Sequence, residues 1–194
     1  GVQTCALPIS LNVGDVVSVT VTMSEATTVT GTPQLTLNVG GTSRVASYAS
    51  GSGTTGLVFT YTIQSGDTDA NGISIAADSL ALNGGSLADA AGNAATITHL
   101  AVADNASYLV DTTAPTVSAI AYGTNDGKLA LGEAVNLTVT LSEAVNVVTT
   151  GGTPTLMLNN GGTATYASGS GTSTLTFSYT PASGQDVADL ATAT

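Results

Sequence analysis

The feature that most constrains the fold of this chain is an internal repeat. Residues 48–54, Tyr-Ala-Ser-Gly-Ser-Gly-Thr, recur unchanged as residues 166–172, which lie 118 positions later (166 − 48). Gly14 and Gly132 have the same separation. A period of this length indicates whole domains in tandem rather than the short units of a solenoid. Since the chain has 194 residues, we expect the second copy to be incomplete at its C-terminal end.

The spacing between the two copies changes in two places. Gly-Thr-Pro at residues 31–33 recurs at residues 152–154, which is 121 positions later (152 − 31), and the spacing is 118 again at Tyr48. An odd shift inside a paired strand would turn every side chain to the other face of the sheet. We therefore predict loops or bulges near residues 26–31 and 43–47.

Alternating side chains predict β-strands in both copies. Val17, Val19, Val21 and Met23 fall on one face of a strand, with Ser and Thr between them. The other strands predicted in the first copy are residues 34–39, 44–49, 57–63, 73–82 and 95–102. Short strands separated by glycine-rich turns predict an all-β fold of tandem antiparallel Ig-like β-sandwiches, the second one truncated. A barrel is the minor alternative.

The repeat also divides the chain into domains. We predict a first repeat over residues 11–110, a linker over 111–116 and a second repeat over 117–194. Residues 1–10 share no identity with residues 119–128, and we interpret them as a foreign or disordered segment, with a divergent first strand as the alternative. In a truncated second repeat, Leu175, Phe177 and Tyr179 are expected to lack the strands that cover their counterparts.

The charge of the chain narrows the range of partners. Thirteen acidic residues against Arg44 and Lys128 give a net charge of −11. This charge argues against binding to nucleic acid or to anionic membranes and favours cations. No apolar run reaches the ~18–20 residues of a membrane span, so no membrane insertion is expected. The single Cys5 excludes an internal disulfide.

One stretch has the spacing of a calcium loop. Asp67, Asp69 and Asn71 supply oxygens at positions one, three and five, a glycine follows at position six, and Asp78 closes the loop at position twelve. The closing residue is Asp rather than Glu, and the second copy lacks the pattern. The alternative is a polar, solvated turn.

A second group of acids is expected near the linker. If the strands alternate in direction, the loops at one end of the first repeat lie near the loop after the second strand of the second repeat. Carboxylates at that joint would repel each other unless a cation such as Ca²⁺ neutralised them. The residues that this argument brings together are Asp15, Asp67, Asp69, Asp104, Asp111 and Glu143.

The remaining polar residues are interpreted as structural. His99 has no second histidine or partner cysteine in the pattern around it, and no serine is paired with a usable His–Asp arrangement, so we expect no enzyme activity. Asp89 and Asn93 are expected to be turn residues whose side chains bond their own backbone. Pro115 is expected to end strand pairing and to stiffen the linker.

Several motifs in this order resemble one family. They are Asp-Gly-x-x-x-x-Gly-Glu at 126–133, Gly-Thr-Pro-x-Leu-x-Leu at 31–37, Tyr-Ala-Ser-Gly-Ser-Gly-Thr at 48–54, Asp-Ala-Ala-Gly-Asn at 89–93 and Asp-Thr-Thr-Ala-Pro-Thr-Val at 111–117. Together they resemble the bacterial Ig-like, cadherin-like tandem repeats of giant secreted and cell-surface adhesins. The resemblance covers residues 11–194. It implies a sandwich repeated in an extracellular filament, often stiffened by Ca²⁺, with neighbouring repeats of the same chain as partners and no catalysis.

These observations lead to one preferred function and two alternatives. The preferred function is a spacer repeat of a secreted adhesin whose cell-surface or matrix ligand binds outside this fragment. A carbohydrate- or ice-binding module is less favoured, because Trp is absent and the outward Ser18, Thr20 and Thr22 form only a short array. An accessory repeat of a secreted enzyme is the third possibility.

Overall fold

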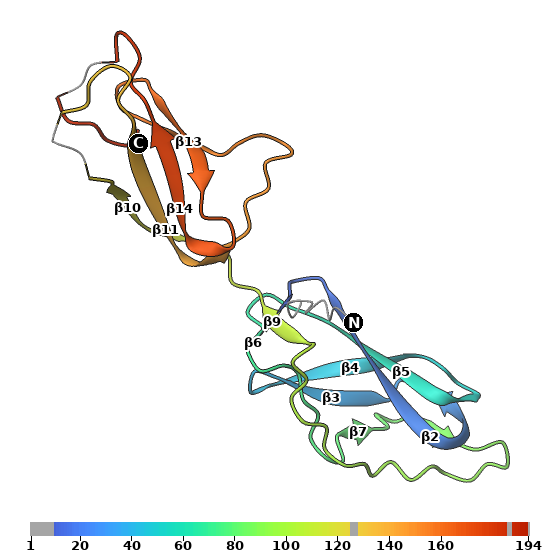
Figure 1. Ribbon diagram of the computed structural model, residues 1–194. Coiled ribbons are helices and arrows are strands. Elements are labelled where there is room, and N and C mark those ends of the chain that lie inside the picture. The colour runs from blue at the N-terminus through green and yellow to red at the C-terminus, as the bar shows by residue number, and fades with distance from the viewer. Residues whose placement is uncertain (1–9, 125–127, 186–187, 194) are drawn as a thin grey trace, which may run out of the picture. The chain divides into compact units, whose positions relative to one another are not determined.

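The computed structural model describes residues 10–124, 128–185 and 188–193 (Figure 1). The all-β prediction is confirmed, because this part of the chain contains strands and no helix. Two compact units divide between Thr113 and Ala114, inside the predicted linker. The segment predicted to be foreign lies outside the described residues, except for Ser10. No helix in the described part is long and apolar enough to cross a membrane.

The first unit is built on a six-stranded sheet. Its strand order is β7-β3-β4-β5-β2-β8. The strand β2 is irregular between Thr22 and Thr27: its first half pairs with β5, and its last three residues pair with β8, so one strand joins two parts of the sheet. The bounds are β2 Val16–Thr30, β3 Gln34–Val39, β4 Thr42–Ser50, β5 Thr54–Thr62, β7 Leu80–Ala81 and β8 Ser86–Ala88.

A smaller three-stranded sheet contains both ends of the first unit. Its order is β1 (Ser10–Leu11), β9 (Leu109–Asp111) and β6 (Thr68–Asp69), with β9 in the centre. The pair β1–β9 is parallel, whereas β6–β9 is antiparallel. Asp111 pairs with Thr68, so the last strand of this unit extends one residue into the predicted linker.

The alternating residues predicted to face inward do form the core of the first unit. Leu57, Phe59 and Ile63 have no exposed surface, and Val17 is 2% exposed. Val19, Val21 and Met23 are half-buried against this core.

The second unit has one five-stranded sheet, with order β10-β11-β14-β13-β12. Its bounds are β10 Val117–Tyr122, β11 Val135–Val145, β12 Thr155–Met157, β13 Thr163–Ser168 and β14 Thr172–Tyr179. We expected Leu175, Phe177 and Tyr179 to be uncovered for want of the strands that cover their counterparts, but they are only 8%, 4% and 2% exposed, so other residues of this unit cover them. The partly buried Leu156 and Leu190 pack against the same core.

The identical heptapeptide forms the same contacts in both units. The rings of Tyr48 and Phe59 pack edge to face with centroids 5.9 Å apart, and the Tyr48 hydroxyl accepts a 2.7 Å hydrogen bond from Ser52 N–H. The Ser52 hydroxyl in turn accepts from Val29 N–H at 2.9 Å. Gly51 has φ 105°, and a Cβ there would lie 2.0 Å from the Gly56 carbonyl oxygen.

The second unit repeats these contacts at the same offset of 118. Tyr166 packs against Phe177 at 5.9 Å, and its hydroxyl accepts from Ser170 N–H at 2.9 Å. The Ser170 hydroxyl accepts from Val147 N–H at 2.9 Å. The sequence identity of this segment is therefore explained by a structural turn rather than by a binding site.

The predicted positions of the length changes are only partly right. Residues 26–30 belong to β2, whose register is irregular between Thr22 and Thr27, next to the first predicted position. Residues 43–47 belong to β4 and pair regularly with β3, and the nearest irregularity, toward β5, is between Tyr48 and Ser50. In the second unit the extra residues follow β11, and the deletion shortens the hairpin between β12 and β13. A hairpin can be trimmed at its tip because Leu35–Ala46 and Leu156–Ala164 keep the same pairing.

Two predicted strands are mostly irregular. Residues 73–82 form only isolated bridges before β7, since Asp78 adopts a left-handed φ of 55° that interrupts the pleat. The main chain of residues 95–102 is hydrogen-bonded to Leu87 at its start and to Asp78 and Ile75 further along. Its partner therefore changes along the segment, and no continuous ladder forms.

Candidate functional site

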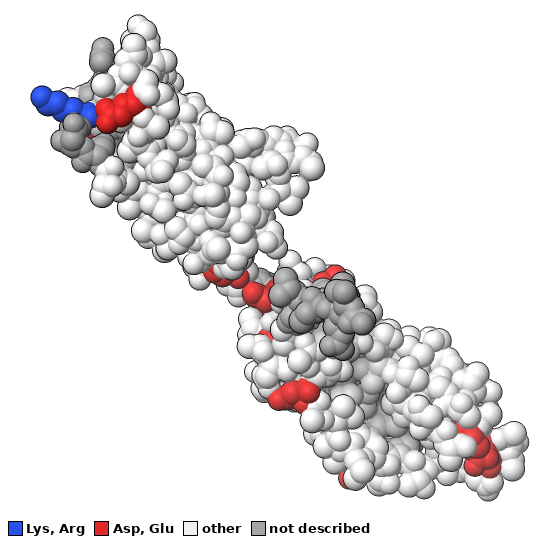
Figure 2. All heavy atoms as spheres, viewed as in Figure 1, with Lys and Arg blue, Asp and Glu red and all other residues white. Residues whose placement is uncertain are grey.

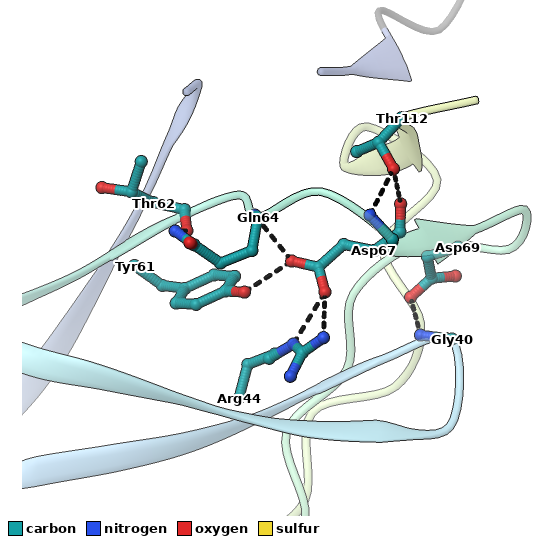
Figure 3. Close-up of polar contacts among 9 residues, drawn as sticks. Gly40, Arg44, Tyr61, Thr62, Gln64, Asp67, Asp69 and Thr112 are labelled. Atoms are coloured by element: carbon teal, nitrogen blue, oxygen red, sulfur yellow. Dashed lines mark hydrogen bonds and ion pairs between the residues drawn. The ribbon is translucent and has the colours of Figure 1, made fainter. Parts of the chain in front are cut away.

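The predicted calcium loop begins in the turn between β5 and β6, where Asp67 is 2% exposed. Its Oδ2 atom accepts hydrogen bonds from the Tyr61 hydroxyl at 2.5 Å and from Gln64 N–H at 2.9 Å. Its Oδ1 atom accepts from Arg44 Nε at 2.7 Å and forms an ion pair with Arg44 Nη2 at 2.5 Å (Figure 3). Both oxygens of this carboxylate are therefore bonded to donors of the protein itself.

The sequence explains why these groups meet. Tyr61 belongs to the inward face of β5, so its ring enters the core while its hydroxyl reaches the end of the strand. Arg44 is on β4, next to β5 in the sheet. A buried carboxylate is costly unless it is paired and hydrogen-bonded, and Arg44 is the only arginine in the chain.

Asp69 is buried at 3% exposure and bonds only main-chain groups. Its Oδ2 accepts from Gly40 N–H at 2.7 Å, and its Oδ1 accepts from Gly72 N–H at 2.7 Å and Asn71 N–H at 3.2 Å. Gly40 is at the tip of the β3–β4 hairpin, and a Cβ there would lie 1.8 Å from the Thr68 carbonyl oxygen. The carboxylate thus joins the hairpin to β6 at a close backbone approach.

Thr112, at the C-terminal end of the first unit, is hydrogen-bonded to the same turn. Its hydroxyl donates to the Asp67 carbonyl oxygen at 2.9 Å and accepts from Gly66 N–H at 3.0 Å. The turn that presents Asp67 is therefore fastened to the residue that follows β9.

The environment of this cluster shifts two pKa values. Burial, the largest single influence, raises the pKa of Asp67, but hydrogen bonds from Tyr61, Gln64 N–H and Arg44, with the charge of Arg44, outweigh it and lower that pKa below its usual value. Burial, followed by the bond to Asp67, raises the pKa of Tyr61 to about 12. At neutral pH Asp67 is ionised and Tyr61 is a neutral donor.

The second unit has a neutral version of this cluster. Tyr179 and Gln185 lie 118 positions after Tyr61 and Asp67, and the Tyr179 hydroxyl donates to Gln185 Oε1 at 3.0 Å. The same Oε1 accepts from Ala182 N–H at 2.8 Å, as Asp67 accepts from Gln64 N–H. Asn160 Nδ2 donates to the Tyr179 hydroxyl at 2.7 Å. The two units thus share the geometry of a tyrosine hydroxyl and its acceptor, and the acceptor is charged in the first unit and neutral in the second.

The other predicted ligands are distributed over several local contacts. Asp15 accepts from Asn12 N–H at 2.8 Å, Asp111 from Thr113 N–H at 2.9 Å, and Asp78 from His99 N–H at 2.9 Å. Asn71 Nδ2 donates to Asp104 Oδ2, which brings these two predicted ligands together. Glu143 is in β11 of the second unit, and its role as a ligand stays a prediction.

The hollow beside the cluster is open and about 620 Å³ in volume. The polar residues Asp69, Asn71 and Asp111 line it, together with residues that include Gly40 and Val110. Within the described ranges, no three His, Cys, Asp or Glu side chains lie close enough to hold a metal ion. A calcium ion in this hollow would need amide or main-chain oxygens and water as additional ligands.

Two residues interpreted as structural do have structural contacts. His99 Nε2 lies 3.0 Å from Ser79 N and accepts its N–H, and its Nδ1 lies 2.9 Å from the Leu100 carbonyl oxygen. Asp89 accepts from both the N–H and the side-chain amide of Asn93. The Ser79 hydroxyl also lies 3.3 Å from His99 Nε2, and the partner of His99 Nδ1 is a main-chain carbonyl rather than a carboxylate.

Sequence reasoning missed the partners of Asp67. Arg44, Tyr61 and Thr112 lie 23, 6 and 45 residues from it, so no local motif contains them. One signal was present: a tyrosine at the end of an alternating strand precedes a polar acceptor by six residues in both copies, at Tyr61 and at Tyr179.

No protein-family model, no curated protein and no solved structure matches this chain. The resemblance to bacterial Ig-like repeats therefore depends on the residue motifs alone.

We predict that Arg44→Met destabilises the first unit, because it leaves the buried carboxylate of Asp67 without its counter-charge. The double variant Arg44→Met with Asp67→Asn is expected to regain most of this loss, since it approaches the neutral cluster of the second unit. Chemical denaturation followed by NMR of amides from each unit measures both values. A single variant as stable as the wild type would contradict the structural role of the ion pair.

We also predict that the first unit loses stability at acid pH through Asp67 and at alkaline pH through Tyr61. Because the folded pKa of Asp67 is lowered, its stabilisation is complete above the unfolded value of about 3.9 and is lost as pH falls through the folded pKa. The pKa of Tyr61 is raised, so its stabilisation is complete below about 10 and is lost as pH rises through about 12. Denaturation of the first unit from about pH 2 to about pH 12 measures both limits.

The control for the loss of stability at acid pH is Asp67→Asn, which removes the titrating carboxylate. The acid-dependent loss in the first unit should become smaller in this variant, while the second unit, with Gln185 at the equivalent position, should not respond to the substitution. An unchanged acid limit in Asp67→Asn would show that other groups cause it.

Proposed function

We propose that this chain is a structural spacer from a large extracellular bacterial adhesin, secreted or displayed at the cell surface. The observation that supports this most is the repetition of contacts as well as sequence. Both units use the same Tyr–Phe packing, the same serine-bridged turn and the same tyrosine–acceptor geometry. Tandem copies that preserve packing contacts suit a protein whose role is length and mechanical continuity.

The surface also supports a spacer. Figure 2 shows that most of the visible surface is uncharged and that the acidic side chains gather in a few small groups. The chain has only two basic residues, and its net charge of −11 disfavours association with the anionic cell envelope. In this proposal, adhesion to a cell or matrix ligand belongs to other parts of the protein, and neighbouring repeats are the direct partners.

Calcium is the second part of the proposal. Asp69, Asn71 and Asp111 line the open hollow, and Asp104 is bonded to Asn71. We propose Asn71, Asp104 and Asp111 as the main ligands of a bound ion, because Asp67 is already paired with Arg44 and both oxygens of Asp69 already accept main-chain hydrogen bonds. An ion there would hold the end of β9 against β6 and so stiffen the exit of the chain from the first unit.

Calorimetry of the whole chain tests both parts. We expect saturable Ca²⁺ binding that Asp104→Asn weakens about tenfold or more, because each charged ligand adds strongly to the affinity. We expect no saturable binding of neutral or acidic polysaccharides at dissociation constants below about 1 mM.

The matched control is Asp89→Asn, which removes an acid that bonds Asn93 and does not line the hollow, and which should leave Ca²⁺ binding unchanged. Absence of Ca²⁺ binding would contradict the calcium part and leave the spacer part intact. Saturable polysaccharide binding would contradict the spacer part, because the repeat would then be a ligand-binding module.

A further inference from the structure

The first and last strands of the first unit are direct neighbours and run in the same direction. Ser10 pairs with Leu109, and Leu11 pairs with Val110. The chain enters β1 at one end of this pair and leaves β9 at the other end. Tension applied to the two ends of the unit therefore pulls the strands past each other, so that the hydrogen bonds between them are loaded together rather than opened one at a time.

The pair β1–β9 is too short to resist this load by itself, since only two residues of each strand are in register. On its other side, β9 pairs with β6 through Thr68–Asp111 and Asp69–Val110. Thr112 adds two hydrogen bonds to the same turn, one to the Asp67 carbonyl oxygen and one from Gly66 N–H. Val110 is 3% exposed, so the middle of β9 is also held in the core.

The strand β6 is fastened in turn to the main sheet by its two buried carboxylates. Asp69 Oδ2 accepts from Gly40 N–H at the tip of the β3–β4 hairpin. Asp67 pairs with Arg44 on β4 and accepts from Tyr61 on β5. A continuous series of short polar contacts thus leads from the end of β9 into β4 and β5, the middle strands of the sheet.

We infer that this series of contacts is a mechanical clamp, in which Thr112, Asp67 and Arg44 transmit tension from the C-terminal strand of the first unit into its main sheet. The clamp gives the buried acids a function that needs no metal ion. The biological role of the clamp rests on the proposed spacer function, whereas the contacts from which it is inferred do not.

Single-molecule pulling of the full chain tests the clamp. With handles at the two termini, rupture of the first unit is recognised by the release of about 350 Å of chain, since about 100 residues extend by about 3.3–3.6 Å each. We expect Thr112→Val, which keeps the side-chain shape but removes the hydroxyl, to raise the rupture rate at constant force about 5- to 10-fold, as for one or two lost hydrogen bonds. Arg44→Met should raise it further.

A second pulling geometry separates the clamp from general stability. Cysteines at Ser18 and Ser47, exposed on β2 and β4, carry the handles in a Cys5→Ser background, so that the load crosses β5 and bypasses β1 and β9. Here Thr112→Val should change the rupture rate less than about twofold. Tyr48→Phe, which removes one hydrogen bond outside the clamp, should have little effect when the termini are pulled.

The outcomes are distinct. A larger effect of Thr112→Val in the terminal geometry than in the bypass geometry supports the clamp. Equal effects in the two geometries, or no effect when the termini are pulled, would overturn it. Neither result depends on whether the chain binds polysaccharide, so failure of the clamp is distinguishable from failure of the spacer function.

Discussion

The end of the first unit depends on how one buried carboxylate is compensated. Asp67 is removed from water and ionised, and its two oxygens are bonded to a hydroxyl, a main-chain N–H and a guanidinium. Tyr61 and Gln64 lie at the end of β5 and in the turn after it, whereas Arg44 is on β4, so satisfying the carboxylate fixes this turn relative to β4. Because the carboxylate is buried, removing one of these donors would leave it poorly compensated, which costs more than losing a surface contact.

The second unit shows that the charge is not required for the turn. Gln185 takes the place of Asp67, and its Oε1 accepts from the Tyr179 hydroxyl and from a main-chain N–H three residues after that tyrosine. Gly162 stands near the ring of Tyr179, and Asn160 supplies the additional donor. A neutral acceptor needs no counter-ion, which explains why this unit has no arginine there. The tyrosine and its acceptor are the common element, and the ion pair is an addition of the first unit.

Much of the fold could be predicted from periodicity. The alternation around Val17 and Phe59 identified strands and their buried faces, because a half-buried strand has a two-residue period. The strand at residues 34–39 has the predicted bounds. Residues 73–82 could not be predicted in the same way, since the left-handed Asp78 breaks a stretch whose composition still alternates. The repeat located the changes in length but not the secondary structure around them, because a hairpin tip can shorten while the strand register is kept.

The candidate site was harder to predict. The spacing of Asp67, Asp69 and Asn71 has the order of oxygens found in calcium loops, but spacing does not show whether a carboxylate faces solvent or the protein. Here Asp67 and Asp69 turn inward, toward donors as distant in sequence as Gly40 and Arg44. A turn rich in acidic residues can therefore serve packing as well as ion binding, and only the three-dimensional partners distinguish the two.

We infer that the buried acids make the β6–β9 end part of the cooperative core of the first unit. Native-state hydrogen exchange of the Gly40, Gln64 and Gly72 amides, the donors to these carboxylates, tests it most directly. We predict that these amides exchange only by global unfolding, with the same protection as the Phe59 amide in β5. Exchange through a local opening, at rates that Arg44→Met does not change, would contradict it.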